Sequence, residues 1–309
     1  DHRDLHSFPT RRSSDLNHRP LKIRRRQMSK LDCNVVVITG AANGIGKELA
    51  RRFAARGSKL ALTDIDGKHL ERLESELRAK GSEVYTEVFD ISDYAAVEKF
   101  SANVFKRFGS IDILFNNAGV IAAGSTWETP VNDWHWLMKV NVMGVVHGIK
   151  AFVPSMIKQD RECRVVNTAS IAGLVTVENS PAYVGSKFAA VSLTEVLELQ
   201  LQQAGAKVKA HVICPAVVQS DLNNCERHRP ADLYNADDPG YKTEDFKKRN
   251  SVVQMSMAFG KPAETAVTKI IRGLENDTFY IQTHLEASPL IGLRNMGIMS
   301  GSRPKKIVR

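Results

Sequence analysis

The sequence lacks the features that mark membrane-spanning, disulfide-rich and metal-binding proteins. Its four cysteines in 309 residues are scattered and form no Cys-x-x-Cys pair, so they fit neither a zinc site nor a disulfide framework. No apolar run approaches the length of about 18 residues that a membrane span needs, and His135, His147 and His211 lack the spacing of metal ligands. We therefore expect no metal, no membrane span, and buried thiols in a reducing, cytoplasmic compartment.

Most of the chain carries less net positive charge than the total of +9 suggests. The net charge is +9, but residues 1–27 hold eight Lys and Arg against three Asp, which leaves +4 for all other residues. No patch of basic and aromatic side chains accompanies this small excess. We therefore expect no binding to nucleic acid.

Residues 1–28 show no helical or strand period that could contribute to a core. Their first part, DHRDLHSFPTRRSSDL, lacks the apolar centre of a secretory signal. Its Arg and Ser content fits a mitochondrial presequence loosely, but Pro9, Pro20 and three Asp oppose an amphipathic helix. The string resembles a translated sequencing-library adapter, with a targeting segment and a genuine basic tail as alternatives. We expect a disordered leader, with Met28 as a candidate start.

From residue 33 onward, short β-branched runs alternate with helical segments. Strands are expected at 33–39, 59–63, 83–89, 111–115, 164–168, 208–214 and 278–282. Helices are expected between them, including one capped by Ser92 and a long one over 132–152. This alternation predicts a single α/β domain over 29–285, with a mostly parallel sheet covered by helices on both faces. We call the polar, irregular stretch 217–258 the substrate loop, and expect a frayed tail over 286–309.

A glycine-rich turn, TGAANGIG at 39–46, joins the first strand to the first helix. Gly40 permits a sharp turn, Gly44 lets the backbone approach a pyrophosphate, and Gly46 lets the helix lie close to the sheet. The free N–H groups at the helix start attract phosphates. The turn therefore predicts a dinucleotide site.

Asp64, at the end of the second strand, indicates NAD rather than NADP. A carboxylate there accepts hydrogen bonds from ribose hydroxyls and repels a 2′-phosphate. No Lys or Arg stands at 63, 65 or 66, and residue 43 is Asn, although Lys68 lies one helical turn away. NADP is the less favoured cofactor.

Tyr183 and Lys187 provide a pair suited to proton transfer. Reduction of a ketone needs a hydride on carbon and a proton on oxygen, and a tyrosine hydroxyl can donate that proton. Because Lys187 lies four residues after Tyr183 on one helix face, we expect its charge to lower the Tyr183 pKa from about 10. Ser170 follows the fifth strand, at the sheet edge where ligands bind, and can hold the substrate oxygen. It has no GxSxG sequence around it, which argues against a Ser-His-Asp hydrolase.

Taken in order, these motifs resemble those of the classical short-chain dehydrogenases/reductases over about residues 31–284. The matching segments are TGAANGIG (39–46), FDIS (89–92), NNAG (116–119), Asn141, Ser170 and YVGSK (183–187). The resemblance implies a doubly wound Rossmann-type domain with a seven-stranded sheet, and a homodimer or homotetramer. Surplus apolar residues on the segments 134–152 and 182–201 agree with subunit contacts.

The resemblance also implies residue roles. Asp90 and Ile91 would hold the adenine, the segment 117–119 would support the sheet beside the adenosine ribose, and Asn141 would relay a water to Lys187. The expected catalytic residues are Asn141, Ser170, Tyr183 and Lys187. The expected cofactor-binding residues are Gly40, Asn43, Gly44, Ile45, Gly46, Asp64, Asp90, Ile91, Asn117, Ala118, Gly119, Tyr183, Lys187, Pro215, Val218 and Ser220.

One position departs from the family pattern. The family usually has Pro-Gly after the sixth strand, whereas this chain has Pro215-Ala216. Because alanine tolerates a positive φ poorly, we expect an altered turn near the nicotinamide.

The sequence thus predicts an oxidoreductase that moves a hydride between NAD(H) and a secondary alcohol or ketone, with Tyr183 as the acid/base. The alternatives are an NADPH-preferring carbonyl reductase and a non-catalytic dinucleotide-binding sensor or scaffold. Steroid-like, acyl-chain and small polyol or keto substrates remain open.

Overall fold

The computed structural model describes residues 34–234 and 237–304. The predictions for residues 1–28 therefore lie outside the described residues. The described chain forms a seven-stranded, all-parallel sheet of order β3-β2-β1-β4-β5-β6-β7. The strands are β1 (Val35–Thr39), β2 (Lys59–Asp64), β3 (Val84–Val88), β4 (Ile113–Asn116), β5 (Cys163–Thr168), β6 (Val208–Cys214) and β7 (Tyr280–Gln282).

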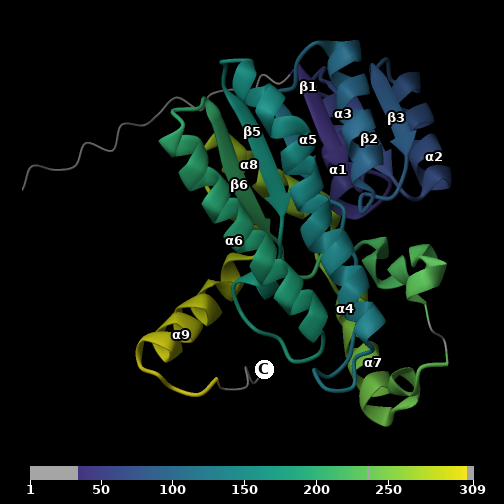
Figure 1. Ribbon diagram of the computed structural model, residues 1–309, viewed down its shortest axis with the longest axis vertical. Helices are drawn as coiled ribbons and strands as arrows, with labels where there is room; N and C mark the ends of the chain where they lie inside the picture. Colours follow the sequence, from purple (N-terminus) through teal and green to yellow (C-terminus); the bar gives the residue numbers. More distant parts are fainter. Residues whose placement is uncertain (1–33, 235–236, 305–309) are drawn as a thin grey trace, which may run out of the picture.

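Two layers of helices cover the sheet (Figure 1). One face carries α1 (Gly44–Ala54), α2 (Gly67–Ala79) and α8 (Ala263–Glu275), and the other carries α3 (Tyr94–Phe108), α5 (Gly144–Lys158) and α6 (Pro181–Gln203). Val36 packs with the first layer and Val37 with the second, and both are fully buried. An unbroken apolar run such as β1 suits a strand buried on both faces. The predicted doubly wound α/β fold is confirmed.

The strand order reverses between β1 and β4. In open α/β sheets, the crevice for ligands lies at the carboxyl ends of the strands beside such a switch point. The fold therefore places a binding crevice where β1 and β4 end.

A long helical stretch runs from α4 (Val131–Leu137) through a π-helical segment (Met138–Met143) into α5. This stretch is long and apolar enough to cross a membrane by length and composition, with a mean hydropathy of 1.4. It contains no uninterrupted apolar run of that length, because polar residues such as Asn141 and His147 divide it. Half of its apolar window is buried inside the protein, and Phe152 lies in the main core, as in a core helix.

Three local predictions are wrong. Asp93 rather than Ser92 caps α3, because the Asp93 carboxylate accepts from the N–H groups of the first turn. The substrate loop is not irregular: it holds a 3₁₀ segment (Asp221–His228) and α7 (Glu244–Ala258), whose start is capped by Thr243. The expected frayed tail contains α9 (Ser288–Met299), which has no buried residue and therefore carries no core-facing apolar pattern.

Candidate active site

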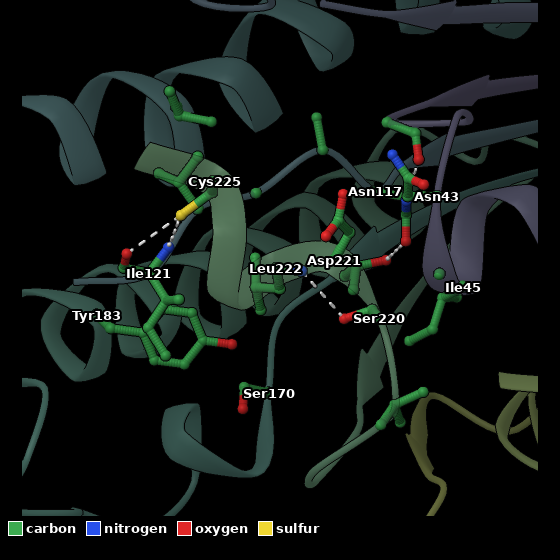
Figure 2. A pocket seen from close by; sticks show the side chains of 18 of the residues that line it. Asn43, Ile45, Asn117, Ile121, Ser170, Tyr183, Ser220, Asp221, Leu222 and Cys225 are labelled. Carbon is green, nitrogen blue, oxygen red and sulfur yellow. Dashed lines mark hydrogen bonds between the residues drawn. The ribbon is translucent and has the colours of Figure 1, made fainter. Parts of the chain in front are cut away.

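A cavity of about 430 Å³ opens where the strands end on either side of the switch point. It is lined by every predicted site residue except Gly46 and Asn141. Asp64, Asp90 and the glycine-rich turn line one part. Ser170, two residues after the end of β5, and Tyr183 and Lys187 of α6 also line the cavity. Figure 2 shows Tyr183 and Ser170 on one side of the view and Asn43 and Asn117 on the other. The fold therefore brings the glycine turn and the catalytic candidates into one cavity.

The glycine-rich turn is built from conformations and close contacts that a side chain would disturb. Gly40 and Gly44 have positive φ values of 63° and 52°. A Cβ on Gly46 would lie 2.1 Å from the Gly40 carbonyl oxygen, so the start of α1 touches the turn itself. Within the described residues, no side chain caps α1 at Asn43, so its first N–H groups can bind an anion.

We expect Gly46→Ala to destabilise the protein by at least about 1–3 kcal/mol, the usual cost of overpacking, and to abolish dinucleotide binding. The added methyl group would meet backbone atoms, which cannot rotate away. Gly292→Ala is the matched control, because nothing lies within 4 Å of its Cβ position in α9. Thermal melts and NADH titration of both variants measure the effect. Equal stability and affinity in the two variants would refute the close packing.

Asn117 joins three strand ends beneath the cavity. Its backbone N–H donates to Thr39 Oγ1 at 2.9 Å, and its Nδ2 donates to the carbonyl oxygens of Thr39 and Gly40 at 3.1 and 3.0 Å. Its Oδ1 accepts from Thr168 Oγ1 at 3.3 Å. The side chain therefore fixes the glycine turn of β1 to the ends of β4 and β5.

Hydrogen bonds from two backbone N–H groups fix the position of the Asp64 carboxylate. Its Oδ2 accepts from the Ala42 N–H at 2.8 Å, and its Oδ1 accepts from the Asp66 N–H at 2.9 Å. Burial raises the pKa of Asp64, and these two hydrogen bonds oppose the rise. A carboxylate has about four acceptor sites, so Asp64 can still accept hydrogen bonds from a ligand in the cavity.

Sequence reasoning missed a cation at this end of the cavity. Arg227, from the substrate loop, lines the cavity and pairs with both Asp66 and Asp221. Residue 227 lies 161 positions after residue 66, so no local sequence pattern places the two side by side. Because two carboxylates share it, the charge of Arg227 is largely balanced.

Tyr183 and Lys187 lie on the same side of α6, as predicted from their spacing, but their electrostatics differ from the prediction. Burial raises the pKa of Tyr183, and a hydrogen bond with Ser170 opposes that rise in part. Lys187 Nζ lies 5.5 Å from the centre of the tyrosine ring and donates to the Thr168 carbonyl oxygen at 3.0 Å. Burial also lowers the pKa of Lys187 to about 8. The expected lowering of the Tyr183 pKa by Lys187 is not observed, because burial sets the direction of the shift and the opposing contribution comes from Ser170.

Ser170 sits directly after β5 with its hydroxyl in the cavity wall. Its Oγ donates to the Pro215 carbonyl oxygen at 3.2 Å and accepts from the Ala172 N–H at 3.1 Å. These bonds orient the hydroxyl near Tyr183 (Figure 2).

Asn141 lies behind the cavity wall, in the π-helical segment, and is fully buried. Its Oδ1 accepts from the Val120 N–H, and its Nδ2 donates to the Val120 carbonyl oxygen and to Ser186 Oγ. These three bonds go to the wall of the cavity rather than to Lys187. These bonds give Asn141 a positioning role in that wall, and the water relay to Lys187 stays a prediction.

Ala216 in the Pro215-Ala216 turn does not have a positive φ, the conformation that alanine tolerates poorly. Among the described residues, the non-glycine positions with positive φ are Asp160 and Asp277, not Ala216. The Ala216 N–H donates to His284 Nδ1 at 3.3 Å. The Pro215-Ala216 sequence therefore places no strained backbone at Ala216.

Several apolar side chains also line the cavity that no sequence motif singled out. They come from the loop after β4, the long helix, the 3₁₀ segment and α7, and include Ile121, Trp136, Val140, Leu222, Val253 and Met257. Their spacing in the sequence carries no common signal, because the fold alone brings these elements together. Within residues 34–234 and 237–304, no group of His, Cys, Asp and Glu could hold a metal ion.

Comparisons with known proteins agree with this architecture. The model of a protein family described as short chain dehydrogenase matches residues 34–231. A CLA biosynthesis dehydrogenase/reductase of Lactiplantibacillus plantarum is 39% identical over 270 residues, which cover 87% of this chain and 94% of that protein. A meso-2,3-butanediol dehydrogenase of Serratia marcescens is 38% identical over 195 residues, which cover 63% of this chain and 75% of that protein.

A similar solved structure is a short chain dehydrogenase/reductase from Burkholderia phymatum in complex with NAD. Its TM-score is 0.86 at 38% identity, and the match covers 89% of this chain and 98% of that chain.

Proposed function

The chain belongs to the short-chain dehydrogenase/reductase family, and from this premise we propose that it moves a hydride between NAD(H) and a secondary alcohol or ketone. Because its relatives are named dehydrogenases and reductases, the chain is an oxidoreductase that acts on CH–OH groups. The observation that carries the finer proposal is the cavity that joins the glycine turn and Asp64 to Ser170, Tyr183 and Lys187.

The described residues fit a nicotinamide dinucleotide. The uncapped start of α1 suits a pyrophosphate, and Gly40 and Gly44 line the cavity beside it. A Cβ on Gly119 would lie 3.2 Å from Asn141 Oδ1 and 3.4 Å from Lys187 Nζ, so a glycine there keeps the wall beside Lys187 open.

In the proposed mechanism, the residues of this chain orient the substrate oxygen and move its proton. The bound dinucleotide supplies the hydride acceptor or donor. Tyr183 gives a proton to the oxygen during reduction and takes it back during oxidation. Ser170 holds the same oxygen once its hydroxyl hydrogen turns from the Pro215 carbonyl oxygen toward the substrate. Lys187 in its charged form stabilises the phenolate that remains.

The choice of NAD rests on Asp64 and on the state of Arg227. Asp64 faces the cavity with acceptor capacity to spare, and a carboxylate repels a phosphate. Arg227 is the observation that favours the second candidate, an NADPH-preferring carbonyl reductase, because a guanidinium pairs well with phosphate. We favour NAD because Asp66 and Asp221 already engage Arg227.

We expect NADH to bind more tightly than NADPH by at least about 1.4 kcal/mol, roughly tenfold. Asp64→Ala is expected to narrow this gap, since it removes both the ribose acceptor and the repulsion. Fluorescence titration of each cofactor against the parent and the variant measures it, with a thermal melt to check the fold. Equal affinities in the parent protein would exclude this role for Asp64.

We also propose a homodimer or homotetramer in the cytoplasm. Exposed apolar side chains on α4 to α6 support an oligomer, namely Val131, Met138, Met143, Ile157, Val196 and Leu199. Several side chains that the sequence suggested for this contact, such as Trp136 and Leu137, are instead buried in the core. The described cysteines are buried free thiols, which suits a reducing compartment.

A further inference from the structure

The Tyr183 end of the cavity has a neutral wall made mainly of hydrocarbon. Ile121, Trp136 and Val140 line it from the loop after β4 and the long helix, and Leu222, Val253 and Met257 line it from the substrate loop. Figure 2 shows Ile121, Leu222 and Cys225 near Tyr183. A substrate held by Tyr183 therefore meets apolar side chains from two directions.

The charged side chains that line the cavity either lie beside the glycine-rich turn or already have a partner. Asp64 and Asp90 accept from backbone N–H groups beside β2 and β3. Asp221 and Arg227 pair with each other, and Lys187 donates to the Thr168 carbonyl oxygen. An anionic group close to the reacting carbon would lose its hydration without gaining a dedicated cation.

The polar side chains at the Tyr183 end are neutral, and several are already engaged. The Cys225 thiol accepts from the Ile121 N–H and donates to the Ile121 carbonyl oxygen. Ser256 Oγ donates to the Val252 carbonyl oxygen, and Asn179 Oδ1 accepts from Arg249. A second hydroxyl on the substrate would therefore find few partners.

The mouth of the cavity is apolar as well. Val177 and Val252 line the cavity and are also exposed, at 43% and 42% of their surface. An alkyl chain can therefore run from Tyr183 outward along α7 and stay in contact with hydrocarbon.

We propose that the substrate is a secondary alcohol or ketone with hydrocarbon on both sides of the reacting carbon, one side extending toward α7. This inference rests on the proposed function. It excludes vicinal diols, polyols and 2-hydroxy acids as preferred substrates, because each places a polar or charged group against the apolar wall.

The test on the parent protein is NADH-dependent reduction of 2-butanone, 2-hexanone, 2-octanone and 2-decanone, with 3-hydroxy-2-butanone as the polar comparison. We expect kcat/KM to rise about fourfold per added methylene until the chain leaves the wall, as expected for burial of one CH₂ group. A flat series, or a higher kcat/KM for 3-hydroxy-2-butanone than for 2-octanone, would overturn the inference while leaving the proposed hydride transfer intact.

Two variants of α7 test whether the preference for longer ketones arises from contacts inside the cavity. Met257 lines the cavity, whereas Met255 lies on the same helix, is 62% exposed and does not line it. Met257→Glu is expected to lower kcat/KM for 2-octanone at least about tenfold, the loss of one good apolar contact. Met255→Glu is expected to stay within about twofold of the parent, in the range of neutral surface changes. Equal effects of the two substitutions would remove α7 from the substrate site.

If no ketone is turned over, a binding measurement tests the apolar substrate site independently of the proposed hydride transfer. Calorimetric titration of 2-octanone and 3-hydroxy-2-butanone into the protein–NADH complex then decides the matter. Tighter binding of 2-octanone supports the apolar site although the proposed activity fails. Binding of 3-hydroxy-2-butanone alone, or of neither compound, overturns the inference. If the Met257→Glu variant does not fold, the ketone series on the parent protein and this titration still test the inference.

Discussion

Tyr183→Phe is expected to lower kcat by at least about 100-fold, the smallest effect typical of a positioned acid. The substitution removes one hydroxyl and keeps the ring, which packs against the main core. Lys187 keeps its bond to the Thr168 carbonyl oxygen, so the neighbouring wall is undisturbed. Rates of NADH-dependent ketone reduction for parent and variant measure the effect.

The control for this variant is NADH affinity, which should change by less than about 1 kcal/mol because the lost hydrogen bond goes mainly to the reacting oxygen. Lys187→Ala, in contrast, should reduce both turnover and NADH binding. A Phe variant with full activity would show that Tyr183 is not the acid, even if the fold assignment stands. A non-catalytic sensor would show no turnover in the parent.

Asp133→Ala is expected to lower the free energy of unfolding by about 3–5 kcal/mol, as when one partner of a buried ion pair is removed. Asp133 on α4 pairs with Arg229 of the substrate loop, and each side chain is only 1% exposed. The guanidinium also lies over the Trp136 ring, 4.3 Å from its centre, and Tyr241 donates to the same carboxylate. The variant leaves the Arg229 charge buried, with the half-exposed Glu226 as its remaining charged partner and two neutral acceptors, the Leu233 carbonyl oxygen and the Tyr241 hydroxyl.

Asp245→Ala is the matched control for this ion pair. Its partner Arg249 lies four residues away on α7, and the pair is partly exposed, so its loss should cost no more than about 1 kcal/mol. Urea unfolding measures both variants, and limited proteolysis within 217–258 detects a loop that detaches without global unfolding. Equal results for the two substitutions in both assays would contradict a role of Asp133 in holding the substrate loop.

The strands and the glycine turn could be predicted from the sequence because their signals are local. The run of β1 is apolar throughout, since both faces are covered, and Gly40, Gly44 and Gly46 stand at fixed offsets from it. The boundary of β6 agrees with the prediction, and the other strands differ by one or two residues where described. The cavity likewise collects most of the predicted site residues, because strand ends meet at the switch point.

The remaining features depend on contacts between distant segments. Arg227 reaches Asp66 only because the substrate loop folds back to the start of α2. The Tyr183 pKa rises because the folded protein removes water from its hydroxyl group. The hydrogen bonds of Asn141 to Val120 and Ser186 were not predictable, since the π-helical turn sets its direction. Helices α7 and α9 lack a buried apolar face, so their periodicity was too weak to identify.

The most direct test of the central claim is transfer of deuterium from NADH labelled at carbon 4 to a ketone, followed by mass spectrometry and NMR of the alcohol. We expect one deuterium on the carbinol carbon for each labelled NADH consumed, and loss of this transfer in Tyr183→Phe. Tight NADH binding without deuterium in any alcohol product would contradict the account and favour a dinucleotide-binding protein without hydride-transfer activity.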